Sequence, residues 1–151
     1  MMREGTTTPG ASSMKQHLIL WPLIAQIILV LLLFVRLGQL KDRARAAGKV
    51  DPAITALDND AWPDDVRKVA NNIRTQFQVP VLFFVLVLAL FAHGAVDGYA
   101  RAFAWLFVAS RIAHTYVHIG SNYVPRRTLF FKLSLLFVLG LLILLIRAQL
   151  T

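Results

Sequence analysis

Four long apolar runs alternate with polar segments along the chain. They cover residues 18–40, 79–96, 100–119 and 129–146. Each is close to the ~20 residues that a helix needs to cross the hydrocarbon core of a bilayer, at ~1.5 Å per residue. Backbone in lipid must satisfy its own hydrogen bonds, so continuous runs of this length indicate helices rather than barrel strands. The pattern predicts an all-α membrane protein, a bundle of four transmembrane helices.

The segment before the second run predicts a helix that continues outside the membrane. Turn residues and acids at positions 58–65 suit a helix N-terminus, so the second helix is expected to begin there and to project about three turns. Pro80 cannot donate to the carbonyl of Gln76, which predicts a kink. The first run lacks a cleavage site after it and is expected to be retained. Residues 1–16 are predicted to be a disordered tail, and residues 17–151 a single four-helix domain.

Composition supports lipid as the main solvent and sets the expected topology. The chain is 57% hydrophobic and has a net charge of +8. In a soluble protein that charge would suggest nucleic acid, but here the basic residues gather in the loops at 41–74 and 120–128, and no nucleic-acid module is visible. Positive-inside counting places these loops in the cytoplasm and both termini outside. We therefore expect a multi-pass integral membrane protein, of the inner or plasma membrane in a bacterium. The lack of cysteines excludes disulfides and thiolate metal sites.

Ionisable residues inside the spans are costly in lipid and indicate candidate sites. Helical spacing places Arg111, His114, His118 and Asn122 on one stripe of the third span. Arg36 ends the first span at similar depth, and the second helix adds further basic and amide residues, among them Arg67, Asn72, Arg74 and Gln76. Such a cluster suits a small anionic, peptide-like ligand, although arginines that reach headgroups and amides that bridge helices are an alternative. With no acid or thiol beside the histidine pair, no metal site is predicted.

Several of these residues lie in segments that resemble a known family. The segments are RIAHTYVHIG at 111–120, PRRT at 125–128, NNIRTQFQVP at 71–80 and FVRL at 34–37. Over residues 18–150 the chain resembles the membrane-associated proteins in eicosanoid and glutathione metabolism. The resemblance implies a homotrimer in which glutathione binds between subunits near the cytoplasmic surface, while a small lipophilic substrate enters from the bilayer. The implied partners are therefore a second and third copy of the chain, membrane lipids and that substrate.

The resemblance also implies roles for individual residues. Arg127 would stabilise the glutathione thiolate, and Thr128 stands where prostaglandin-forming members have a serine that hydrogen bonds to it. A cation close to a thiol lowers the pKa of that thiol, which is the physical reason for this placement. The resemblance implies that Arg36, Arg111, His114 and His118 bind glutathione. From the polar cluster on the second helix, Arg67, Asn72, Arg74 and Gln76 are predicted to bind it as well.

The sequence departs from the family pattern at three positions. His118 and Phe131 stand where many members have tyrosines, and Gln76 or Gln78 stands where the second helix carries a glutamate. Two functions remain open. The retained residues favour a glutathione-dependent transferase or peroxidase, and the lost ones favour a non-enzymatic lipid-binding scaffold or an accessory subunit of a larger membrane complex.

Overall fold

The computed structural model describes residues 16–150, and all of its regular elements are helices. The elements are α2 (Leu20–Ala46), α3 (Pro52–Thr55), the short 3-10 helix η1 (Asn59–Ala61), α4 (Asp64–Gln76), α5 (Val79–Ala92), α6 (Gly98–Ile119) and α7 (Val124–Leu150). The predicted disordered tail therefore lies outside the described residues except for Gln16, whose side-chain amide donates to the carbonyl of Gly94 over 2.6 Å.

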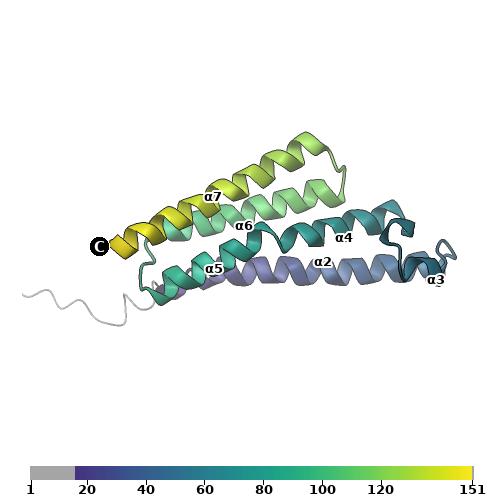
Figure 1. The fold of residues 1–151 in the computed structure, drawn as a ribbon, viewed down its shortest axis with the longest axis horizontal. Helices are drawn as coiled ribbons and strands as arrows, with labels where there is room; N and C mark the ends of the chain where they lie inside the picture. Colours follow the sequence, from purple (N-terminus) through teal and green to yellow (C-terminus); the bar gives the residue numbers. More distant parts are fainter. Residues whose placement is uncertain (1–15, 151) are drawn as a thin grey trace, which may run out of the picture.

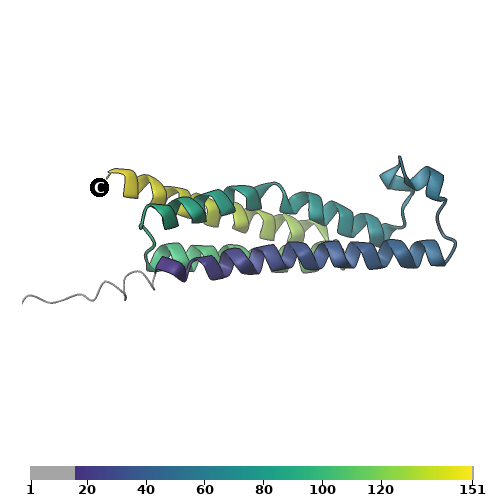
Figure 2. The same cartoon turned by 90° about the horizontal axis from the view of Figure 1, so that it is seen from below.

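The helices form four rods that run along one axis (Figures 1 and 2). α4 and α5 follow each other in one rod, and α6 packs against α7, α2 and α4. The start of α2 and the end of α7 lie at one end of the bundle, and α3 lies at the opposite end (Figure 1). The predicted four-rod helical layout is confirmed, with both ends of the described chain at the same end of the bundle.

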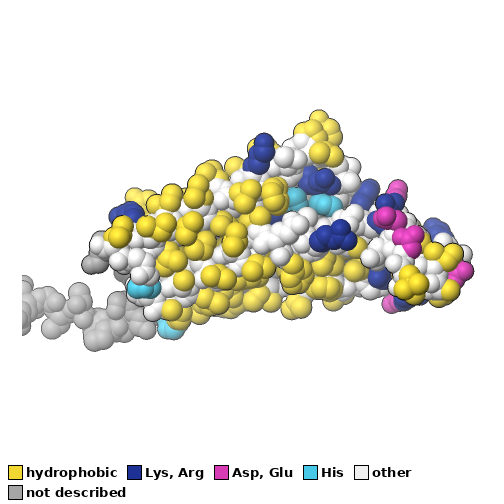
Figure 3. Space-filling view, viewed as in Figure 1, with side chains coloured by type: hydrophobic (Ala, Val, Ile, Leu, Met, Phe, Trp, Pro, Cys, Tyr) yellow, Lys and Arg dark blue, Asp and Glu magenta, His cyan; other side chains and the backbone are white. Residues whose placement is uncertain are grey.

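Three of the rods are long and apolar enough to cross a membrane. They are α2, the pair α4–α5 taken together as Asp64–Ala92, and α7. α6 has 22 residues, about 33 Å of helix, which is also long enough, but its arginines and histidines interrupt the apolar surface. Apolar side chains cover most of the face seen in Figure 3, and charged side chains gather at the end that carries α3. The chain is a multi-pass integral membrane protein.

The second rod is broken where the sequence predicts a kink. α4 begins at Asp64, within the predicted segment 58–65, and runs for 13 residues. It ends at Gln76, and α5 begins at Val79 with Pro80 as its next residue. Pro80 has no N–H to donate to the carbonyl of Gln76, and the helix is interrupted at Phe77 and Gln78. The last carbonyls of α4 therefore lack the usual helical partners and become available to side chains from other helices.

The first connection is anchored to the helices outside the apolar spans by Trp62. This indole is 5% exposed and belongs to a cluster with Leu40 and Val66. The ammonium of Lys41 lies 4.7 Å from the centre of its ring, and the guanidinium of Arg45 lies 5.3 Å away. Burial of the ring and two cation–π contacts therefore hold the connection against α2 and α4.

Replacing Trp62 by alanine is expected to loosen this connection. Truncating a buried tryptophan typically lowers the free energy of unfolding by about 3–5 kcal/mol. The measurements are the melting temperature in detergent and the rate of proteolysis between residues 41 and 63. Leu57→Ala is the matched control, since Leu57 lies in the same connection and is 95% exposed. Equal melting temperatures for the two variants would contradict the anchoring role.

Candidate functional site

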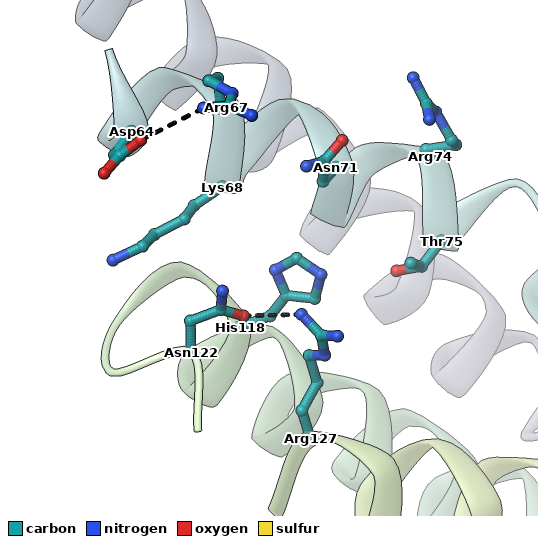
Figure 4. Close-up of a pocket in the computed structure, with 9 residues that line it drawn as sticks. All are labelled: Asp64, Arg67, Lys68, Asn71, Arg74, Thr75, His118, Asn122 and Arg127. Atoms are coloured by element: carbon teal, nitrogen blue, oxygen red, sulfur yellow. Dashed lines mark hydrogen bonds and ion pairs between the residues drawn. The ribbon is translucent and has the colours of Figure 1, made fainter. Parts of the chain in front are cut away.

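One face of α4 lines the largest described cavity, at the end of the bundle where α4 projects beyond the apolar spans. Asp64, Lys68, Asn71 and Thr75 are three or four residues apart and therefore share that face. Across from them stand residues of α6, of the α6–α7 connection and of α7 (Figure 4). The cavity measures about 550 Å³ and is lined by Asp64, Arg67, Lys68, Asn71, Arg74, Thr75, His118, Asn122 and Arg127. We call it the basic cavity.

The basic cavity carries an excess of positive charge. Of its lining residues, Arg67, Lys68, Arg74 and Arg127 are cations and Asp64 is the one acid. Arg67 is paired with Asp64 over 3.4 Å and with an acid of η1 over 3.1 Å. Within residues 16–150, no salt bridge joins the other three cations to an acid. An anionic ligand would therefore be attracted to this space.

Arg127 is held at the basic cavity from two sides. Its Nη1 donates to Asn122 Oδ1 over 2.7 Å (Figure 4). Asn122 has a positive φ of 52°, a conformation that asparagine tolerates better than most residues. The carbonyl oxygen of Arg127 lies 3.0 Å from Nδ1 of His114, so that nitrogen must carry a proton and donate it. These contacts fix both the backbone and the guanidinium of Arg127.

A smaller cavity adjoins the basic cavity. It measures about 210 Å³ and is lined by Thr75, His114, His118, Arg127, Thr128 and Phe131. Three of these residues, Thr75, His118 and Arg127, also line the basic cavity. The two spaces therefore share a wall made of a hydroxyl, an imidazole and a guanidinium. We call the smaller space the inner cavity.

Arg111 does not line either cavity. Its side chain is fully buried, and its Nη2 donates to the carbonyl oxygen of Thr75 over 3.2 Å and to the Thr75 hydroxyl over 3.1 Å. Thr75 belongs to the last turn of α4, where the helix break leaves carbonyls unpaired and partially negative. Arg111 thus caps α4 of its own chain through Nη2, while its Nη1 is buried without a partner among the described residues.

Gln76 joins three helices through a buried polar network. Its Oε1 accepts from Arg111 Nε over 3.3 Å and from Gln26 Nε2 over 3.0 Å. Its Nε2 donates to Asn72 Oδ1 over 3.2 Å and to Thr115 Oγ1 over 3.0 Å. Asn72 and Gln76 are 0% and 1% exposed. Both therefore face the interior of the bundle rather than the basic cavity.

The structure brings some of the predicted site residues together and separates others. At the two cavities lie Arg67, Arg74, His114, His118, Arg127 and Thr128. In the interior network lie Asn72, Gln76 and Arg111. Arg36 is exposed on α2 and lines neither cavity, so the expected convergence of Arg36, Arg111 and Arg127 does not occur within one chain. Thr75 also lines both cavities but was not predicted, although its helical spacing from Asp64, Lys68 and Asn71 places it on the same face of α4.

The sequence was also compared with known proteins. The profile of the MAPEG family matches residues 19–147. The chain belongs to the MAPEG family. No curated protein and no solved structure matches it significantly. In this MAPEG protein, most of the polar residues that carried the resemblance thus divide between two cavities, which could hold a ligand, and an interior network, which holds the broken helix in place; Arg36 belongs to neither group.

Proposed function

We propose that this MAPEG protein is a glutathione-dependent transferase or peroxidase that acts on a lipophilic substrate near the cytoplasmic face. The observation that carries the proposal is the basic cavity, with three cations that lack an acid partner among the described residues. Glutathione is a peptide with two carboxylates, one ammonium group and a thiol. Its volume suits a cavity of about 550 Å³, and the amides of Asn71 and Asn122 can hydrogen bond to its peptide groups.

The inner cavity is the proposed place for the thiol. Arg127 supplies a cation and Thr128 a hydroxyl, which together would stabilise a thiolate. In a transferase the thiolate sulfur would attack an electrophilic carbon, and in a peroxidase it would attack a peroxide oxygen. Phe131 gives this cavity an apolar wall. A substrate dissolved in the bilayer could approach along that wall.

We further propose a homotrimer with glutathione bound at the subunit interface. Arg36 is exposed on α2 and lines neither the basic nor the inner cavity of its own chain, which suits a contact with the cavity of a neighbouring subunit. The proposed orientation places the first and third connections in the cytoplasm, because they hold most of the basic loop residues. The basic cavity would then open to cytoplasmic glutathione.

A lipid-binding scaffold is the second candidate. A small apolar cleft of about 200 Å³ lies beside the helix break and is lined by Ile27, Val30, Leu31, Gln76, Phe77 and Phe84. This cleft would suit an acyl chain. The loss of the family's acid gives the scaffold little support, however, because neither Gln76, which faces the interior, nor Gln78, which is exposed, lines the basic cavity.

Glutathione is expected to raise the melting temperature of the detergent-solubilised protein. A ligand that binds only the folded state stabilises it by about 2.7 kcal/mol at 100 times its Kd. Arg74→Glu should weaken this stabilisation, because it reverses a charge in the basic cavity. Arg43→Glu is the control, since Arg43 is exposed on α2 outside that cavity. If millimolar glutathione leaves the melting temperature unchanged, the proposed enzymatic function is rejected and the lipid-binding scaffold is favoured.

A further inference from the structure

We propose that His118 is the proton acceptor that converts the bound thiol into a thiolate and passes the proton to the basic cavity. This inference rests on the proposed function and adds a catalytic role to a residue so far placed among the binding positions. It depends on the place of the ring between the two cavities, on its free nitrogens and on the charges around it.

His118 forms part of the wall between the two cavities. Its ring projects from α6 toward α4, next to the guanidinium of Arg127 (Figure 4). It lines both the basic and the inner cavity, while only 5% of its surface is exposed. A thiol held in the inner cavity by Arg127 and Thr128 would therefore be next to this ring. On its other side the ring meets the larger space, through which a proton can reach water.

The ring nitrogens of His118 are available to accept a proton. No hydrogen bond joins either nitrogen to another residue between positions 16 and 150, and Nδ1 is buried without a partner there. His114, with its ring centre 5.5 Å away, differs because its Nδ1 donates to the carbonyl of Arg127. A neutral imidazole always has one nitrogen with a free lone pair. In His118 that lone pair accepts no hydrogen bond from another described residue.

The surrounding charges favour a thiolate as the product of proton transfer. Arg111 and His114 lie near His118 on its own helix, and Arg127 faces it from α7. From α4 the basic cavity receives the cations Arg67, Lys68 and Arg74 and the acid Asp64. This excess of positive charge stabilises an anion next to the ring. It also favours release of the proton to water over its retention at the site.

The proposed step is balanced within the site. The S–H bond breaks, its electron pair stays on sulfur as the thiolate beside Arg127, and the proton forms a new N–H bond on His118. The imidazolium then gives this proton to water in the basic cavity and returns to its neutral form. A positioned general base of this kind typically accelerates a reaction about 10²–10⁴-fold. A tyrosine at this position could donate a hydrogen bond to a thiolate, but its phenol stays protonated below a pKa of about 10 and its neutral oxygen is a far weaker base than imidazole.

The test is to mix the full-length protein in detergent with glutathione and follow the ultraviolet absorbance of the thiolate together with proton release to an indicator dye. In His118→Asn we expect thiolate formation to be slower by about 10² or more, while glutathione still raises the melting temperature. Added imidazole should restore part of the rate. His118→Tyr should be slow as well, and it provides the same comparison if His118→Asn does not fold. His93→Asn is the control, since His93 is exposed and follows the last residue of α5, the helix that ends away from α3 (Figure 1).

Two results would overturn the role of His118, and they differ in what else they reject. A wild-type rate in a His118→Asn protein that still binds glutathione would reject the proton acceptor and leave the proposed function intact. Absence of glutathione stabilisation in the wild-type protein would reject the proposed function and the proton acceptor with it.

Discussion

Replacing Arg127 by alanine is expected to reduce the thiolate signal of bound glutathione to background and to lower turnover about 10²–10³-fold. The guanidinium lies on the wall shared by both cavities, so it is the cation closest to the proposed thiol position. Without it, the thiol would keep an ordinary pKa and be mostly protonated at neutral pH. The measurements are the ultraviolet absorbance of the thiolate and the turnover of a lipophilic electrophile. The affinity for glutathione should fall less than the turnover does, because the cations on α4 remain.

Arg126→Ala provides a matched control for this prediction. Arg126 is the preceding residue on the same helix turn, carries the same charge and is exposed. Its guanidinium lies 6.0 Å from the ring centre of Tyr123 and lines neither cavity. Both variants lose one positive charge. A difference in activity between them is therefore due to the position of the cation and not to the net charge of the protein. Equal activity in the two variants would show that Arg127 does not activate the thiol.

Much of the fold could be predicted because lipid leaves the backbone few choices. A span must satisfy its own hydrogen bonds, so the four apolar runs could only be helices of membrane length. The types of residue near position 64 and at position 80 then predicted where the second helix begins and where it breaks. The acids before the second run gave α4 its N-terminus at Asp64, and the ring of Pro80 broke the rod after Gln76. None of these features needs information about which helix packs against which.

The site was only partly predictable, because polarity does not indicate which way a helix is turned. Arg74 and Gln76 are two residues apart and therefore point to nearly opposite sides of α4. Both looked like ligand contacts, yet Arg74 lines the basic cavity while Gln76 is buried against α2 and α6. Arg111 was misplaced for a related reason. Its best partner is a backbone carbonyl exposed by the helix break, and side-chain spacing gives no sign of it.

Arg36 shows a different limit. Its position at the end of an apolar run predicts the depth of the other cations, but depth does not give direction. On α2 it is exposed and lines neither the basic nor the inner cavity of its own chain. Interface surfaces and lipid-facing surfaces are equally apolar in a membrane protein, so composition around Arg36 could not separate them. The contact of Arg36 with a neighbouring subunit is therefore part of the proposed function and cannot be predicted from composition.

Replacing Gln76 by leucine is expected to give the second large effect, a loss of about 3–5 kcal/mol in the free energy of unfolding. Leucine has a similar volume but would leave Arg111 Nε and Gln26 Nε2 without their acceptor. It would also remove the donor to Thr115 Oγ1 and one of the two donors to Asn72 Oδ1, which would keep only the Thr115 hydroxyl. All four groups are buried in apolar surroundings, where an unpaired polar group is expensive. The measurement is unfolding in detergent, and Gln78→Leu is the control because Gln78 is exposed two residues later.

Gln76→Glu, by contrast, is expected to keep or raise the stability, although it removes two donated hydrogen bonds. Asn72 Nδ2 is buried without a partner among the described residues, so the amide of Asn72 can turn and donate to the new carboxylate. The hydroxyl of Thr115 can rotate and donate as well. The carboxylate would also give the buried guanidinium of Arg111 a full counter-charge, which forms a stronger hydrogen bond than the neutral amide does. Equal stability of Gln76→Glu and Gln76→Leu would contradict this prediction. The network would then depend on the hydrogen bonds that Gln76 donates rather than on its acceptor oxygen. The carbonyl and hydroxyl of Thr75 at the end of α4 would be sufficient partners for Arg111.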